Sequence, residues 1–180
     1  MIEEINSSKV EPPNYFNRED KLKWLMRTYG NDVIRVAYTY LKQRQLAEDV
    51  AQDVFIKCFE KMDDFRNESS YKTWILKITV NKCKDVLKSW AFKNLLFTDY
   101  FGNNQEDRTI ESKLLKKEES QLISQQVMEL PLKLREVIIL FYYQEFSIEE
   151  ISVLLKVNSN TIKTRLHRGR LKLKQSFEGE

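Results

Sequence analysis

Residues 147–170 read SIEEISVLLKVNSNTIKTRLHRGR, and this stretch decides the fold of the C-terminal part of the chain. Ser147 and Glu150 have the spacing of a capping box, in which each side chain accepts a hydrogen bond from the backbone N–H of the other residue. A short helix over 148–155 is therefore predicted, and its apolar residues at 148, 151, 154 and 155 lie on one face.

A turn and a second helix are predicted to follow. Residues 156–158 form the turn, with Val157 as its apolar plug, and either Ser159 or Asn160 can cap the next helix. On that helix, predicted over 159–174, Ile162, Leu166, Gly169 and Leu173 share the inner face. The pattern as a whole predicts a helix-turn-helix.

The outer face of the second helix has the composition of a DNA-binding surface. Between residues 161 and 175 the chain has six Lys or Arg and no acidic residue. Short polar side chains can read base edges in the major groove, while the cations beside them hold phosphates. The candidate residues are Asn160, Lys163, Thr164, Arg165, His167, Arg168 and Arg170. A helical hairpin with a solvated basic face is the alternative.

The rest of the chain also has a helical composition. Of its 180 residues, 42% are hydrophobic and 32% are charged; there are 4 Gly and 3 Pro, and strict apolar–polar alternation is scarce. The first helix is predicted to begin near residue 17 and to stop at Gly30-Asn31. Further helices are predicted over 32–43, 46–62, 70–90, 110–129 and 133–144. The polar stretch 98–107 is a candidate linker, which can leave the two halves free or clamp them together.

The helix predicted over 46–62 has an acidic outer face around one apolar residue. Asp49, Gln52, Asp53 and Ile56 recur at spacings of three and four, opposite the apolar face. Such a surface suits docking to a basic, partly apolar protein surface. An ordinary solvated acidic face with one stray isoleucine fits the pattern equally well.

The helix predicted over 70–90 has a stripe of lysines on its outer face. Lys77, Asn81, Lys84 and Lys88 follow one another at steps of four, three and four, and Trp74 borders them. Lysines can track a nucleic-acid backbone while rings and amides meet unstacked bases, so the stripe predicts a single-stranded nucleic-acid site. The loop that leads into it adds the candidates Phe65, Arg66, Asn67, Ser69 and Ser70. Aromatic residues at helical spacing, Trp74 among them, are more often part of a core.

The chain lacks the residues of a metal site or an enzyme active site. Cys58 and Cys83 are the only cysteines, one histidine is present, and no nucleophile–base pair or phosphate-binding glycine loop is visible. We therefore expect no cofactor, no metal, no small-molecule substrate and no catalysis. The N-terminus has no apolar signal sequence and no stretch is long enough to span a membrane, so a cytoplasmic location is expected.

Two blocks of the sequence resemble the extracytoplasmic-function (ECF) sigma factors of the sigma-70 family. The run EDVAQDVF at 48–55, then Phe65, TWILKI at 73–78 and Asn81 resemble their domain 2. LP at 130–131, SIEEI at 147–151 and TIKTRLHRGR at 161–170 resemble their domain 4. The resemblance implies an all-α fold of two small domains. It divides the chain into a flexible arm (1–14), domain 2 (15–97), a flexible linker (98–114) and domain 4 (115–180).

The resemblance also implies a role for each surface. The face of Asp49, Gln52 and Asp53, with Ile56, would bind the coiled coil of the β′ subunit of core RNA polymerase, and domain 4 would bind the β flap. The loop at 65–70 with the lysine stripe would capture flipped bases of the −10 promoter element. The last helix would read the −35 element, and the linker would thread toward the RNA exit channel. A membrane-anchored anti-sigma factor would hold the protein inactive until a stress signal frees it.

Two residues depart from the family pattern, and two other functions compete. Lys77 stands where an arginine is common, and Lys156 replaces the usual glycine of the turn, so its backbone must avoid or tolerate a positive φ. A stand-alone transcriptional regulator would need a ligand pocket within residues 15–97. A helical adaptor protein would leave both basic faces unexplained.

Overall fold

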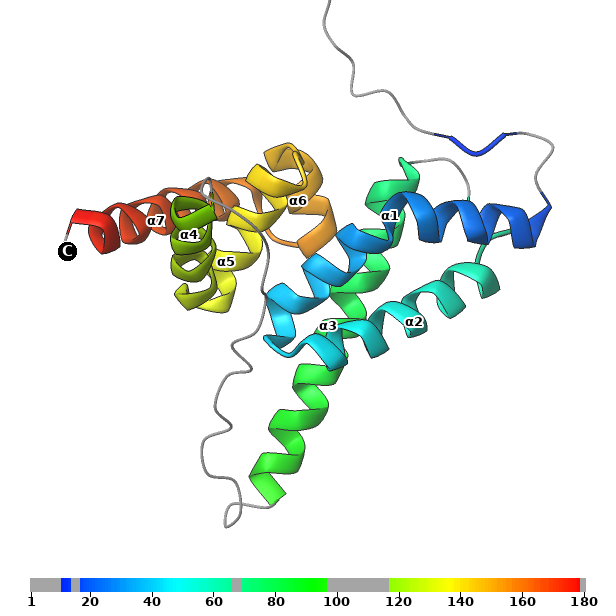
Figure 1. The fold of residues 1–180 in the computed structure, drawn as a ribbon, viewed down its shortest axis with the longest axis horizontal. Helices are drawn as coiled ribbons and strands as arrows, with labels where there is room; N and C mark the ends of the chain where they lie inside the picture. Colours follow the sequence, from blue (N-terminus) through cyan, green and yellow to red (C-terminus); the bar gives the residue numbers. More distant parts are fainter. Residues whose placement is uncertain (1–10, 14–16, 66–68, 97–116, 179–180) are drawn as a thin grey trace, which may run out of the picture.

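The computed structural model describes residues 11–13, 17–65, 69–96 and 117–178, and within these ranges its elements are helices without strands. The all-α prediction is therefore confirmed. The helices form two groups that lie side by side, which we call the N-terminal domain (α1–α3) and the C-terminal domain (α4–α7) (Figure 1).

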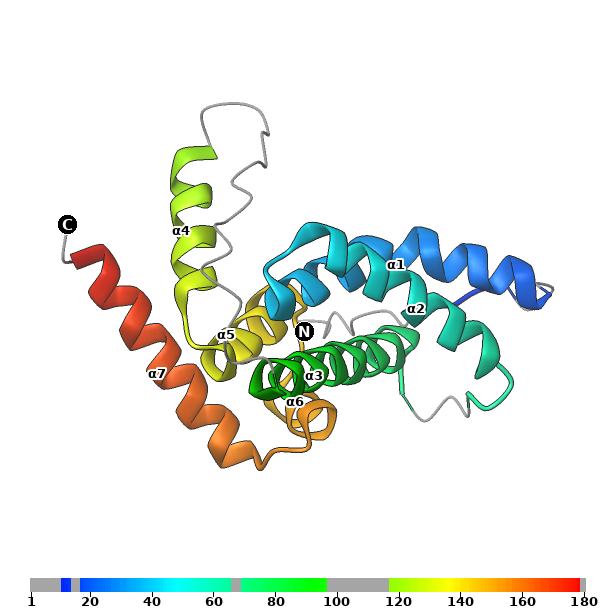
Figure 2. The same ribbon diagram turned by 90° about the horizontal axis from the view of Figure 1, so that it is seen from below.

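The N-terminal domain contains α1 (Arg18–Leu41), α2 (Arg44–Glu60) and α3 (Tyr71–Leu96). Asn17 caps α1, because its side-chain oxygen accepts the N–H of Asp20 at 2.8 Å. Helix α1 packs along α2, and both contact α3 (Figures 1 and 2). The apolar faces predicted for α2 and α3 line this core, with Val54, Cys58, Ile75 and Cys83 fully buried.

The predicted helix stop at Gly30-Asn31 is wrong, because α1 runs through it to Leu41. A glycine inside a helix costs only about 1 kcal/mol. The buried residues Leu25, Tyr29, Val33 and Val36 continue one apolar face past that point, so packing outweighs the local preference. The helix ends at Lys42, which takes the left-handed conformation with φ 57°.

The C-terminal domain contains α4 (Lys117–Glu129), α5 (Leu132–Ile138), the π-helical turn η1 (Ile139–Tyr143), α6 (Ile148–Leu155) and α7 (Ser159–Glu178). The single helix predicted over 133–144 is thus divided in two. Both α3 and α7 extend beyond the predicted ends at residues 90 and 174. The part of the predicted helix 110–129 that precedes Lys117, and the linker over 98–114, lie outside the described residues.

Helices α6 and α7 form the predicted helix-turn-helix. The capping box is confirmed: Ser147 Oγ accepts the N–H of Glu150 at 3.2 Å, and the Glu150 carboxylate accepts the N–H of Ser147 at 2.9 Å. The cap of α7 differs from the prediction, since Asn158, and not Ser159 or Asn160, accepts the N–H of Asn160 at 2.8 Å. Lys156 ends α6 with φ 56° and ψ 47°.

The close approach of α7 to α5 depends on Gly169. A Cβ built on this residue would lie 3.0 Å from Cγ1 and 3.1 Å from Cδ1 of Ile138. Ile162 and Leu166 are buried on the same face. The predicted inner face of α7 is therefore confirmed. None of the helices in the described part of the chain has an apolar stretch that would cross a membrane.

Lys156 offers a test of backbone strain in the turn. The Cβ of a non-glycine residue disfavours the left-handed conformation, so we expect Lys156→Gly to raise the free energy of unfolding by about 0.5–1 kcal/mol. Urea unfolding followed by circular dichroism measures this change. The control is Lys172→Gly, at an exposed position within α7, which should lower the free energy of unfolding by about 1 kcal/mol. A loss of stability in both variants would contradict the strain at Lys156.

Candidate nucleic-acid interface

The outer face of α7 is open to solvent. Asn160, Lys163, Thr164, His167, Arg168 and Arg170 are all exposed, opposite the buried Ile162 and Leu166. The Thr164 hydroxyl donates to the Asn160 carbonyl at 2.9 Å, and Arg170 Nε donates to the Leu166 carbonyl at 3.3 Å. The structure therefore brings these predicted residues together on one helix face that a duplex could reach.

Arg165 is placed differently from its neighbours on α7. Its guanidinium lies 3.0 Å from a carboxylate oxygen of Glu136 on α5, and the two side chains are only 19% and 6% exposed. The residue follows the helix register of buried Ile162 and Leu166, which turns it toward α5. In this conformation Arg165 fixes α7 on α5, and its contact with a phosphate stays a prediction.

The lysine stripe lies along one face of α3. Asn81 and Lys88 are exposed, while Lys77 and Lys84 are half-buried. Lys88 lies 4.0 Å from Asp85, at the limit of an ion pair. The stripe and the outer face of α7 are thus two separate cationic surfaces, one in each domain.

Aromatic side chains pack together where the loop meets α3. The ring of Tyr71 lies 4.3 Å from that of Phe65 and 5.7 Å from that of Trp24, and Phe65 lies 5.0 Å from Trp74. Phe65 and Trp74 are half-buried, so part of each ring serves packing. Sequence reasoning missed Tyr71 and Trp24, although the spacing of Tyr71 and Trp74 on one helix face carried a signal.

The polar residues of the loop are only partly described. Ser70 caps α3, because its hydroxyl oxygen accepts the N–H of Thr73 at 3.1 Å. Ser69 is half-buried beside it. Arg66 and Asn67 lie outside the described residues.

The acidic face of α2 is exposed and partly neutralised. Asp49 and Gln52 are exposed, and Ile56 is 58% exposed between them and the end of the helix. Asp53 forms an ion pair with Lys82 on α3 at 2.8 Å. The surface therefore offers carboxylate, amide and apolar groups to a partner, with one of the predicted carboxylates committed to a lysine of the same domain.

The two domains contact each other through buried and half-buried polar groups. The Tyr40 hydroxyl on α1 donates to the second carboxylate oxygen of Glu136 at 2.6 Å. Burial and the adjacent Glu136 carboxylate raise the pKa of Tyr40 well above its usual value, so the hydroxyl keeps its proton. Lys72 donates to the Gln144 carbonyl at 2.9 Å, and the Gln144 amide donates to Asp32 at 3.3 Å. The two domains are therefore clamped together by these contacts (Figure 2), while the part of the linker in this arrangement lies outside the described residues.

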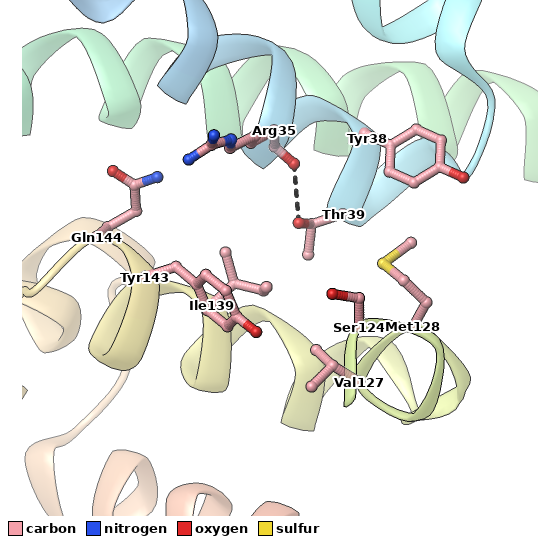
Figure 3. A pocket seen from close by; sticks show the side chains of 9 residues that line it. All are labelled: Arg35, Tyr38, Thr39, Ser124, Val127, Met128, Ile139, Tyr143 and Gln144. Carbon is pink, nitrogen blue, oxygen red and sulfur yellow. Dashed lines mark hydrogen bonds between the residues drawn. The ribbon is translucent and has the colours of Figure 1, made fainter. Parts of the chain in front are cut away.

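A cavity of about 390 Å³ lies at this domain boundary (Figure 3). Helix α1 supplies Arg35, Tyr38 and Thr39, and residues of α4, η1 and the following turn supply the other walls. The Thr39 hydroxyl donates to the Arg35 carbonyl at 2.9 Å, so it is already satisfied. Most of the surface that lines the cavity is apolar. The lining residues come from both domains and not from the N-terminal domain alone.

The cysteines have the environment of core residues. Cys58 and Cys83 are free and fully buried, and burial raises the pKa of each thiol to about 12. A thiol with such a pKa is protonated at neutral pH and a poor nucleophile. Within the described ranges no cluster of three or more His, Cys, Asp or Glu has the geometry to hold a metal ion.

Comparison with known proteins finds one family model in each domain. The family model Sigma-70 region 2 matches residues 25–91, and the model Sigma-70, region 4 matches residues 120–173. The ECF RNA polymerase sigma factor SigW of Bacillus subtilis is 29% identical over 170 residues, which cover 88% of this chain and 90% of that protein. The RNA polymerase sigma factor SigV of the same organism is 32% identical over 143 residues, which cover 78% and 81%.

Two solved structures have the same fold. The sigma factor RpoE from Bartonella quintana, in complex with the anti-sigma factor NepR, superposes with a TM-score of 0.74 at 22% identity and covers 87% of this chain and 96% of its own. CnrH, in complex with the cytosolic domain of CnrY, superposes with a TM-score of 0.64 at 20% identity and covers 91% of each chain.

The ion pair of Glu136 with Arg165 predicts a stability defect. Glu136→Gln removes the negative charge beside a largely buried guanidinium, so the free energy of unfolding should fall by about 1–3 kcal/mol. Urea unfolding measures it. The control is Glu149→Gln in the exposed first turn of α6, which should lower the free energy of unfolding by less than about 1 kcal/mol. Equal stabilities of the two variants would show that the ion pair does not hold α7 in place.

Proposed function

The chain belongs to the ECF group of the sigma-70 family and is a transcription initiation factor, and we propose that its two domains bind one promoter at two points while α2 anchors core RNA polymerase. The observation that carries this proposal is the presence of a partly exposed basic face on α3 and an exposed one on α7, one in each matched region. We further propose domain boundaries at 15–97 and 115–180, with 98–114 as the linker.

The C-terminal domain reads the −35 element with α7. Lys163, Thr164 and His167 occupy the middle of the exposed face, where base edges of the major groove would lie, and Arg168 and Arg170 flank them. Each good base contact contributes on the order of 1–3 kcal/mol of discrimination. The cations add affinity that does not depend on sequence and that weakens with salt. The same domain binds the β flap of the polymerase.

The N-terminal domain captures the opened −10 strand along α3. Asn81 lies between Lys77 and Lys84, so an amide that can hydrogen-bond a base is flanked by cations that can hold the backbone. The packed rings of Phe65, Tyr71 and Trp74 support the loop at the start of this surface. Extruding a base costs a few kcal/mol, which these contacts would offset. Melting is then driven by binding energy.

The exposed face of α2 docks on the β′ coiled coil. Because Asp53 is paired with Lys82, the contact depends mainly on Asp49, Gln52 and Ile56. An exposed isoleucine beside a carboxylate and an amide suits an interface with an apolar centre and a polar rim.

The location and the regulation of the protein follow from this role. The protein acts in the cytoplasm as a specificity subunit without catalysis or cofactor of its own, because the polymerisation chemistry belongs to the core enzyme. An anti-sigma factor binds it and holds it inactive. This part of the proposal is supported by the fold shared with the sigma factor RpoE, whose structure is that of a complex with the anti-sigma factor NepR. The competing regulator with a sensory domain needs a pocket within residues 15–97, whereas the cavity in Figure 3 takes walls from both domains.

Run-off transcription on a random promoter library tests the function. Core RNA polymerase with this protein should select a small set of sequences with two conserved elements, and core enzyme alone should not. Equal start-site distributions with and without the protein would refute the proposal.

Docking through α2 predicts a loss of polymerase binding on a charge reversal. Asp49→Arg with Gln52→Ala should weaken binding to core enzyme about tenfold, because a favourable charge becomes repulsive against a basic partner. Fluorescence anisotropy of the labelled protein measures this affinity. Glu19→Arg, an equal charge change on exposed α1, is the control and should bind as the wild type does. An unchanged affinity of the double variant would remove α2 from the interface.

Strand capture by Asn81 predicts a defect in promoter opening. Asn81→Ala should reduce permanganate reactivity of the −10 region about tenfold, because one base contact is lost, while closed-complex formation changes little. Asn31→Ala, an exposed amide on α1, serves as the matched control. Wild-type reactivity in the Asn81 variant would place strand capture elsewhere.

A further inference from the structure

The carboxylate of Glu136 joins the two domains. One of its oxygens accepts the Tyr40 hydroxyl of α1 at 2.6 Å, and the other lies 3.0 Å from the guanidinium of Arg165 on α7. Tyr40 and Glu136 are both buried. A hydrogen bond to a charged group in such surroundings is stronger than one between neutral groups. It connects the core of the N-terminal domain to α5, the helix on which α7 packs.

The clamped arrangement is too short for a two-element promoter. The −35 and −10 elements lie roughly 25 base pairs apart, which is about 85 Å along straight B-DNA at 3.4 Å per pair. With a rise of 1.5 Å per residue, α3 and α7 are about 39 and 30 Å long. Laid end to end they would span about 70 Å, and here both contact α6, which lies between them (Figure 2). Their exposed faces therefore cannot reach both elements in this state.

The boundary between the domains has the features of an interface that can open. Its direct contacts include three polar tethers, from Tyr40 to Glu136, from Lys72 to the Gln144 carbonyl and from Gln144 to Asp32. Gln144 Oε1 and Arg135 Nε are buried there without a hydrogen-bond partner among the described residues. Burial lowers the pKa of Arg135, because its cation is poorly solvated in the closed state. Water would hydrogen-bond both groups after opening, and this gain offsets part of the free energy that is lost with the interdomain contacts.

We propose that the Tyr40–Glu136 hydrogen bond is a latch that keeps the protein closed when free and that breaks when the domains separate to bind a promoter. The inference rests on the proposed function for the open state only. The α2 face stays exposed in the closed state, so core enzyme can dock first and the domains can separate afterwards. Arg165 stays beside Glu136 within the C-terminal domain, so α7 keeps its place when the latch opens.

Single-molecule energy transfer between the domains tests the latch. Thr28→Cys on α1 and Val153→Cys on α6 are exposed labelling positions, and the native Cys58 and Cys83 are fully buried. The free protein should show high transfer. Tyr40→Phe should raise the open-to-closed ratio at least about tenfold, because one hydrogen bond to a charged group is lost. The control is Tyr38→Phe, which removes a hydroxyl that makes no hydrogen bond with the described residues, and it should match the wild type.

The outcomes separate the latch from the proposed function. Equal open fractions in Tyr40→Phe and the wild type would overturn the latch, even if run-off transcription succeeds. High transfer in a promoter-bound holoenzyme that does transcribe would overturn the required opening. If transcription fails, the free-protein comparison still measures the latch. If circular dichroism shows Tyr40→Phe to be unfolded, Lys72→Met replaces it, since it removes the second tether and should also raise the open fraction.

Discussion

The placement of α7 and the packing of the two domains share one buried carboxylate, that of Glu136. Its two oxygens are used by different partners, the Tyr40 hydroxyl from the N-terminal domain and the Arg165 guanidinium from α7. The second partner supplies the counter-charge that a buried carboxylate needs. As a result, the same group fixes the recognition helix within its domain and holds that domain against its neighbour.

The charges of the N-terminal domain are divided between two helices. Helix α2 presents Asp49, Gln52 and Ile56, and α3 presents lysines with Asn81 between them. The half-exposed ion pair of Asp53 with Lys82 lies between the two surfaces. One small domain can therefore offer an acidic face to a protein and a basic face to a nucleic acid without the two interfering.

Many elements of the fold and of the candidate interface could be predicted from the sequence, because they depend on interactions between residues that are close together in the chain. The capping box of Ser147 and Glu150, the inner face of α7 and the lysine stripe follow from spacings of three and four residues. The stop expected at Gly30 failed because burial of one continuous apolar face outweighs a propensity of about 1 kcal/mol. The cap of α7 shifted to Asn158 because several neighbouring residues can cap equally well.

Contacts between distant residues could not be predicted in this way. Tyr40 and Glu136 are 96 positions apart, and neither has a local pattern that marks it as an interdomain group. The same holds for Arg165, which looks like one more cation of a basic face until α5 is placed beside it. Such roles depend on how the domains pack, and no periodicity encodes them.

The central claim is that one chain opens to contact a single promoter at two separate points. Hydroxyl-radical footprinting of the holoenzyme on a selected promoter, compared with core enzyme alone, tests it most directly. The account predicts two patches of protection that depend on this protein, with centres roughly 25 base pairs apart and unprotected backbone between them. A single continuous patch no longer than the closed molecule would contradict it.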